Sequence, residues 1–137
     1  HSFIGHRPRP TFHGVWGDVI EITTEGAKKK GIRQYTFTDI HDSASWTLLP
    51  GTFEQTKEDV EGVGLFPLIK GGWCMMYDCY RNHHYQFCKT EDLLHFQFVA
   101  NTETKGFFTP RHGTVIQITK KEFNALVCRF HQTASPY

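Results

Sequence analysis

Polar and apolar residues alternate along two stretches in the first half of the chain. Residues 17–23 and 32–38 both follow this period of two and carry β-branched side chains, as half-buried strands do. A shorter apolar run at 45–49 ends at the turn signal Pro50–Gly51. The pattern therefore predicts two strands, a loop and a short third strand that carries Trp46.

The second half repeats this organisation with tighter turns. Gly71–Gly72 separates two apolar runs, and polar clusters separate those that follow. Four strands are predicted here, at 64–70, 73–80, 84–88 and 95–99. Short antiparallel strands joined by tight turns are typical of a propeller blade or of part of a sandwich, so we expect an all-β fold.

The two ends of the chain have patterns that predict different structures. Residues 1–10 are rich in Arg and Pro, which disfavours regular structure and predicts an extended arm. Near the other end, 114–118 has the composition of a strand. Thr119 and Glu122 then form the T-x-x-E pattern that begins a helix. One short helix is expected.

Composition narrows the class of protein. At 137 residues the chain makes one small domain or a piece of a larger one, and 39% apolar content supports a packed core. The net charge is +1, and the only basic run, Lys28–Lys30, is interpreted as a solvated turn. With no apolar stretch of roughly 18 residues, we expect neither a nucleic acid nor a membrane as a partner.

The cysteine and histidine spacing argues against a dedicated metal centre. The four cysteines form no C-x-x-C pair, so most are expected to be free, buried thiols. His83 and His84 are adjacent on a predicted hairpin and point to opposite faces, which disfavours a zinc site with Cys88. A small module that binds metal through its histidines remains an alternative hypothesis.

Glu61 is the most conspicuous candidate for chemistry. It lies between Val60 and Gly62, directly before an apolar, aromatic strand pattern. It could be a solvated carboxylate at a turn. Alternatively, apolar neighbours could raise its pKa to that of a general acid, while the glycines let a ligand approach. Asp78 is interpreted as a structural hydrogen-bonding residue, and Trp46 and Trp73 as core.

Two motifs resemble glycoside hydrolase family 43, in particular its arabinofuranosidase-like and xylosidase-like members. They are EDVEGVGLFPLIKGGWCMMYDCY and FFTPRHGTVIQITKKEF, and the resemblance covers about residues 39–123. It implies a five-bladed β-propeller with three catalytic carboxylates. Such an enzyme would hydrolyse arabinose- or xylose-containing polysaccharides with inversion at the anomeric carbon. The substrate would be an oligosaccharide or polysaccharide, and no cofactor would be required.

The resemblance also assigns roles to residues. Glu61 matches the general acid, and Asp18 matches the aspartate that tunes the pKa of the acid. Arg111 would bind the sugar, and His112 would lie near a structural calcium on the propeller axis; a buried, backbone-bonded histidine is the equal alternative. The general base is expected in a D-P pair, which this sequence lacks.

The length fits about two blades of four-stranded antiparallel sheet, the C-terminal portion of such an enzyme. We expect residues 1–16 to form an arm and residues 17–137 a partial propeller catalytic domain. Exposed sheet edges would favour self-association. The family implies a secreted or periplasmic protein, although the chain contains no signal peptide. The alternative is a non-catalytic carbohydrate-binding or vestigial propeller fragment.

Overall fold

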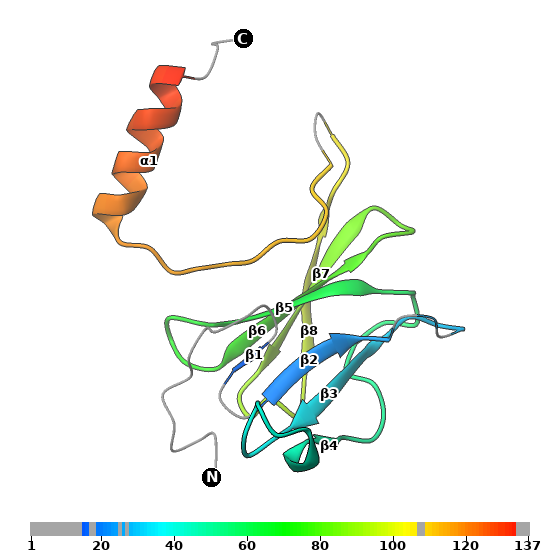
Figure 1. The fold of residues 1–137 in the computed structure, drawn as a ribbon. Helices are drawn as coiled ribbons and strands as arrows, with labels where there is room; N and C mark the ends of the chain where they lie inside the picture. The colour runs from blue at the N-terminus through cyan, green and yellow to red at the C-terminus, as the bar shows by residue number, and fades with distance from the viewer. Residues whose placement is uncertain (1–14, 17–18, 25, 27, 107–108, 134–137) are drawn as a thin grey trace.

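The computed structural model describes residues 15–16, 19–24, 26, 28–106 and 109–133. It consists of two four-stranded antiparallel sheets and one helix that stands apart from them (Figure 1). The first sheet has the order β1-β2-β3-β4 and the second has β5-β6-β7-β8. The predicted all-β fold is therefore confirmed at the level of two antiparallel sheets. The described residues form no closed sheet, so the propeller stays a proposal.

The first sheet comprises β1 (Val15–Trp16), β2 (Val19–Thr23), β3 (Ile32–Thr36) and β4 (Thr47–Leu48). The last two residues of the expected arm thus pair with β2. The strand predicted at 45–49 is reduced to the two residues of β4. Its first residue, Ser45, belongs instead to the 3-10 turn Ser43–Ser45, which the Asp42 side chain caps.

The second sheet comprises β5 (Glu61–Pro67), β6 (Trp73–Cys79), β7 (His84–Thr90) and β8 (Gln97–Glu103). All four predicted strands exist, with shifted boundaries. From Cys74 onward β6 is buried on both faces: Met75 and Tyr77 pack in the core with the first sheet, and Arg111 contacts Asp78 on the other face. Val19 and Ile32 of the first sheet join Met75 and Tyr77 of β6 in one apolar core.

The predicted strand at 114–118 is wrong. These residues run as an extended segment outside both sheets, and the side chain of Ile116 is 72% exposed. Strand-forming composition alone is not enough, because a strand needs a partner edge to satisfy its backbone groups.

The predicted capping box is confirmed, and it starts a helix longer than expected. The Glu122 carboxylate accepts from the Thr119 backbone N–H at 2.7 Å, and the Thr119 hydroxyl accepts from the Glu122 N–H at 3.1 Å. Helix α1 spans Lys120–Thr133. Its apolar side chains are exposed at Phe123, Leu126, Val127 and Phe130. No helix in the described part of the chain is long and apolar enough to cross a membrane.

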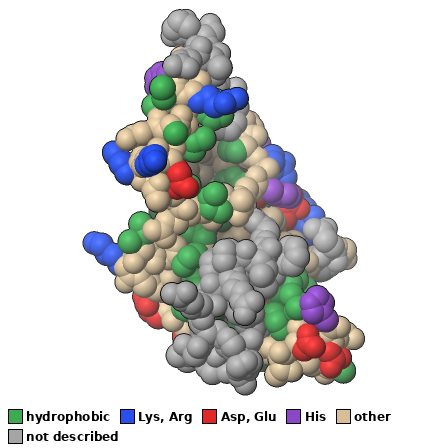
Figure 2. Space-filling view, turned by 60° about the vertical axis from the view of Figure 1, so that its left-hand side comes forward, with side chains coloured by type: hydrophobic (Ala, Val, Ile, Leu, Met, Phe, Trp, Pro, Cys, Tyr) green, Lys and Arg blue, Asp and Glu red, His purple; other side chains and the backbone are tan. Residues whose placement is uncertain are grey.

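Three further features concern the cysteines, Trp46 and the charged side chains of the surface. None of the four cysteines forms a disulfide; Cys74, Cys79 and Cys88 are buried, as predicted, while Cys128 is exposed. Trp46 packs against Tyr35 and Phe37. On the face shown in Figure 2, the described Lys and Arg side chains are scattered among acidic and apolar ones.

Candidate functional site

Glu61 is the first residue of β5, and its cross-strand partner in β6 is Asp78. The ladder is irregular immediately afterwards, because the next aligned pair is Gly64 with Met76. A β-bulge with a glycine in the left-handed region fits this spacing, and Gly62 has a φ of 63°. The bulge places two carboxylates side by side at one end of the second sheet.

Two cations hold this pair of carboxylates together. Arg111 donates from Nε to Asp78 Oδ2 at 2.8 Å and from Nη2 to Glu61 Oε1 at 2.9 Å. Lys30 Nζ donates to Glu61 Oε2 at 2.8 Å. The Asp78 side chain is 1% exposed and that of Glu61 15%. Because Arg111 bridges both carboxylates, it offsets the repulsion that neighbouring like charges would otherwise suffer.

The expected rise in the pKa of Glu61 is wrong. The hydrogen bond from Lys30 is the largest influence, and together with the charges of Lys30 and His112 it outweighs burial and lowers the pKa. Glu61 is therefore ionised at neutral pH in this arrangement. Lys28 and Lys29 are exposed, as expected of a solvated turn, but the Lys30 side chain is only 27% exposed and pairs with Glu61.

The space beside Gly62 is filled by a side chain of this chain. A Cβ built on Gly62 would overlap the imidazole of His112, whose Nε2 lies 3.5 Å from Glu61 Oε1. The glycine thus admits His112 rather than leaving its backbone open to a ligand. The His112 side chain is 54% exposed, which contradicts the alternative of a buried histidine.

Calcium does not fit these residues as they are arranged. Glu61, Asp78 and His112 each present a ligand atom within 4.8 Å of the others. Calcium, however, prefers six to eight oxygen ligands, and both carboxylates here already pair with Arg111 or Lys30. No step proposed below passes through calcium.

The remaining carboxylates differ from this pair. Asp18 lies outside the described residues. Glu21, on β2, is the glutamate with a raised pKa: its side chain is buried, and desolvation raises its pKa from 4.5 to about 8. Neither of its carboxylate oxygens has a hydrogen-bond partner among the described residues. It is buried in the first sheet and outside the cluster around Glu61.

Arg111 and Glu61, which the sequence singled out, are thus brought together, whereas Lys30 and Asp78 were missed as site residues. Asp78 carried a signal, because it is a polar residue within an aromatic strand, and such a residue needs a partner. Lys30 carried none, since its link to Glu61 spans 31 positions along the chain.

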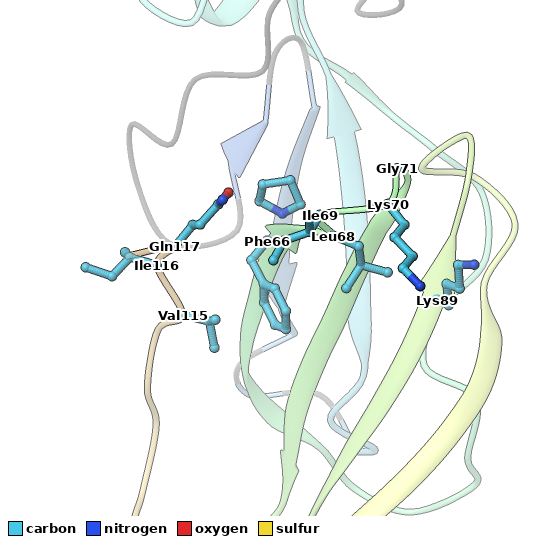
Figure 3. Close-up of a pocket in the computed structure, with 10 residues that line it drawn as sticks. Phe66, Leu68, Ile69, Lys70, Gly71, Lys89, Val115, Ile116 and Gln117 are labelled. Atoms are coloured by element: carbon cyan, nitrogen blue, oxygen red, sulfur yellow. The ribbon is translucent and has the colours of Figure 1, made fainter. Parts of the chain in front are cut away.

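An apolar groove lies elsewhere in the described structure (Figure 3). It has a volume of about 510 Å³ and lies between the turn after β5 and the extended segment at Val115–Gln117. Phe66 and Leu68 line it together with Lys70 and Lys89, but no carboxylate does. Since Phe66 is near the end of β5 opposite to Glu61, this groove is not the site of proton transfer.

Comparison with known proteins gives one match. Residues 13–124 match a family related to glycoside hydrolase family 43 and described as a "Probable glycosyl hydrolase domain". No curated protein and no solved structure matches significantly. The matched range contains Glu61, Asp78 and Arg111 and covers most of the chain. This chain therefore belongs to the family of probable glycosyl hydrolase domains related to glycoside hydrolase family 43.

Proposed function

We propose that this chain carries the proton-donating carboxylate of a glycosyl hydrolase that acts on arabinose- or xylose-containing oligosaccharides and polysaccharides. Glu61 is the proposed general acid, within a propeller of the family type. The observation that carries the proposal is the position of Glu61: a fixed, partly exposed carboxylate at a strand end, held by Lys30 and Arg111. A positioned carboxylate of this kind is what glycosidic proton transfer requires.

Sugar binding must change the protonation of Glu61 for this role. The general acid has to carry a proton, whereas Lys30 keeps Glu61 ionised in the absence of substrate. A neutral sugar that separates Lys30 from Glu61 and excludes water would remove the largest cause of the low pKa and increase desolvation. The substrate itself would thus create the acid.

Arg111 is the proposed sugar-binding residue. Its side chain is 51% exposed, and its hydrogen bonds to Asp78 and Glu61 use Nε and Nη2. A guanidinium has five N–H groups, so it keeps donors for sugar hydroxyls. Asp78 acts by holding Arg111, since its own carboxylate is 1% exposed.

The general base comes from another carboxylate. An inverting enzyme needs a base about 6.5–9.5 Å from the acid, with room for a water between them. Asp78 does not fit this role, because it is buried against Arg111. Asp18 remains the proposed residue that tunes Glu61.

The test is the substitution Glu61→Gln in the full-length protein, assayed on aryl arabinofuranosides and xylosides. With a poor leaving group, we expect the rate to fall by about 10²–10⁴, the usual contribution of acid–base catalysis. With a strongly activated leaving group the loss should be much smaller, because departure then needs little protonation. Glu103→Gln is the control, since Glu103 is exposed, pairs with Lys105 and lies outside the Glu61 cluster. Equal losses with both leaving groups would contradict the acid role.

Sugar binding without turnover is a second candidate. The lowered pKa of Glu61 favours it, since an ionised carboxylate accepts hydroxyl hydrogen bonds but donates no proton. Calorimetry distinguishes the two. Saturable binding of arabinose- or xylose-containing oligosaccharides by a full-length protein without hydrolytic activity would favour this second candidate.

A further inference from the structure

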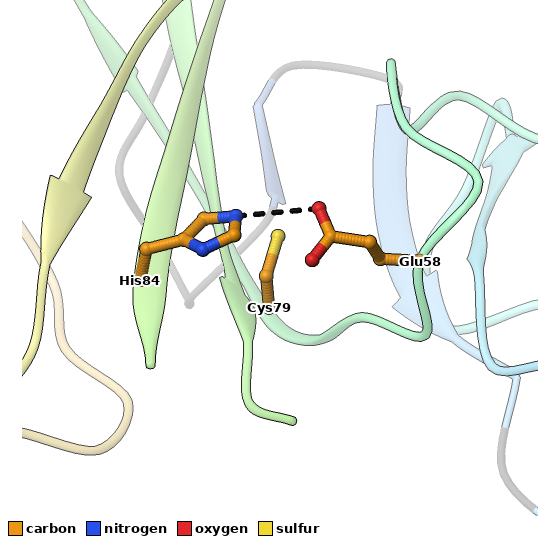
Figure 4. A group of neighbouring side chains, drawn as sticks. All are labelled: Glu58, Cys79 and His84. Atoms are coloured by element: carbon orange, nitrogen blue, oxygen red, sulfur yellow. Dashed lines mark ion pairs between the residues drawn. The ribbon is translucent and has the colours of Figure 1, made fainter. Parts of the chain in front are cut away.

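A second cluster of ionisable side chains lies at the β6–β7 hairpin, outside the site around Glu61 (Figure 4). Cys79 ends β6 and His84 begins β7, and the two are cross-strand partners. Glu58 reaches them from the segment before β5. One ligand atom from each residue lies within 4.8 Å of the others. Residues from three separate positions thus present sulfur, nitrogen and oxygen to one small volume.

Neighbouring groups fix the orientation of the imidazole. His84 Nδ1 lies 3.3 Å from the backbone carbonyl oxygen of Asn82, which can only accept a hydrogen bond. Nδ1 therefore carries the proton in this contact, and Nε2 turns towards Glu58 and Cys79. Metal-binding histidines are commonly held in this way, with one ring nitrogen donating to a carbonyl and the other facing the metal.

Hydrogen bonds also fix the orientation of the Glu58 carboxylate. The Asn82 side-chain amide donates to Oε1, and the Thr56 hydroxyl donates to Oε2 at 2.9 Å. Both carboxylate oxygens are thus held in place beside His84 and Cys79.

The distance between the nitrogen and oxygen donors fits two ligands of a tetrahedral ion. His84 Nε2 and Glu58 Oε2 are 3.3 Å apart, yet Nε2 is buried and has no hydrogen-bond partner among the described residues. With Zn–N and Zn–O bonds of about 2.0–2.2 Å, two ligands of a tetrahedral zinc ion lie about 3.3–3.5 Å apart. Figure 4 shows the thiol of Cys79 beside the line that joins these two atoms.

We propose that Glu58, Cys79 and His84 form a zinc site, with a water as the fourth ligand. The mixed sulfur, nitrogen and oxygen donors select zinc over calcium or magnesium, which prefer oxygen alone. On binding, the Cys79 thiol releases its proton to solvent, and one thiolate and one carboxylate then balance the charge of Zn²⁺. The Glu58 side chain is 28% exposed, which leaves the ion a route in.

A cysteine nucleophile and a plain ion pair each account for the cluster less well than a metal does. A nucleophile would have to reach a substrate, but Cys79 is completely buried. An ion pair between protonated His84 and Glu58 would account for those two residues. It would leave the Cys79 thiol, which also interacts with Glu58, outside the pair.

The test is a titration of the full-length, reduced apo-protein with Co²⁺, a spectroscopic substitute for zinc. We expect one equivalent to give a thiolate-to-cobalt charge-transfer band and tetrahedral visible bands, both abolished by Zn²⁺. Cys79→Ser should remove the charge-transfer band, and His84→Gln should weaken binding by at least about the 10–100-fold that loss of a supporting contact costs. Cys74→Ser, on the same strand, and Cys128→Ser, the exposed thiol, should leave the band unchanged.

A thermal melt keeps the proposal testable if Cys79→Ser does not fold. Zn²⁺ should raise the unfolding midpoint of the wild-type protein and of Cys74→Ser, but not that of His84→Gln, because only an intact site binds the folded state selectively. The proposal is overturned if Zn²⁺ leaves the wild-type midpoint unchanged. A charge-transfer band that survives in Cys79→Ser or disappears in Cys128→Ser overturns it as well.

Discussion

Asp78 and Cys79 are neighbours on β6, and their side chains point to opposite faces of the second sheet. Each belongs to a cluster that also contains a glutamate and a histidine: Asp78 with Glu61 and His112, Cys79 with Glu58 and His84. The first cluster contains Arg111 and Lys30, which balance its carboxylates. The second contains no lysine or arginine contact to Glu58 among the described ion pairs. The two clusters thus have similar carboxylates but differ in whether a lysine or arginine pairs with them. We expect this difference to determine what chemistry each cluster can perform.

Glu21 extends this comparison to a glutamate that has no ion-pair or hydrogen-bond partner among the described residues. It should show the largest effect. Its pKa is raised from 4.5 to about 8, so between these pH values the folded state binds more protons than the unfolded state. The free energy of unfolding therefore falls as pH rises through this window. At about 1.4 kcal/mol per pH unit, the loss is on the order of 4 kcal/mol.

Glu21→Gln should abolish that loss, because an amide cannot ionise. Urea unfolding at several pH values between 4 and 9 measures it. The variant should match the wild type near pH 4 and exceed it at pH 8. Glu103→Gln, an exposed residue that pairs with Lys105, is the control and should follow the wild-type curve. If the unfolding free energies of Glu21→Gln and the wild type changed in parallel with pH, the pKa of Glu21 would not be raised. The buried carboxylate would then have a partner.

Gly62→Ala should have an intermediate effect. The alanine must adopt a φ of 63°, which costs about 1–2 kcal/mol, and its Cβ must displace the imidazole of His112. We expect a total loss of about 1–3 kcal/mol in the free energy of unfolding. Gly51→Ala is the matched control, because Gly51 has a φ of 80° and open space around its Cβ position. Only Gly62→Ala should change the NMR resonances of His112. Unchanged His112 resonances would contradict the contact.

Lys30→Met should have the smallest effect on stability and a specific effect on the site. It removes the hydrogen bond that does most to lower the pKa of Glu61, so that pKa should rise. Carbon-13 NMR of the side-chain carboxyl, followed against pH, measures the change. Lys29→Met is the control, since Lys29 pairs with Glu54 instead. An equal rise in both variants would mean that general charge, and not the Lys30 contact, sets the pKa.

Sequence patterns predicted the elements whose signals are local. The Gly71–Gly72 turn and the apolar runs around it identified β5 and β6, and the T-x-x-E pattern identified the start of α1. The predicted strand at 114–118 failed, because strand formation depends on a partner that composition does not reveal.

The same distinction holds for the two clusters. Glu61 and Arg111 were identified through motifs, but their partners Lys30 and Asp78 are 31 and 33 positions away from them. Without Lys30, only apolar neighbours were visible, so the direction of the pKa change was mispredicted. The pairing of Cys79 with His84 follows from the hairpin register. From the sequence, His83 and His84 were considered only with Cys88, which lies on the same strand as His84, and zinc was disfavoured there.

Sugar binding is proposed to convert Glu61 from an ionised partner of Lys30 into a proton donor. The most direct measurement is the NMR titration of the Glu61 carboxyl in the full-length protein, with and without an arabinose- or xylose-containing oligosaccharide. The pKa should lie below its ordinary value in the free protein and rise when the sugar binds. A pKa that stays low in the saturated complex would contradict the acid role and favour sugar binding without turnover.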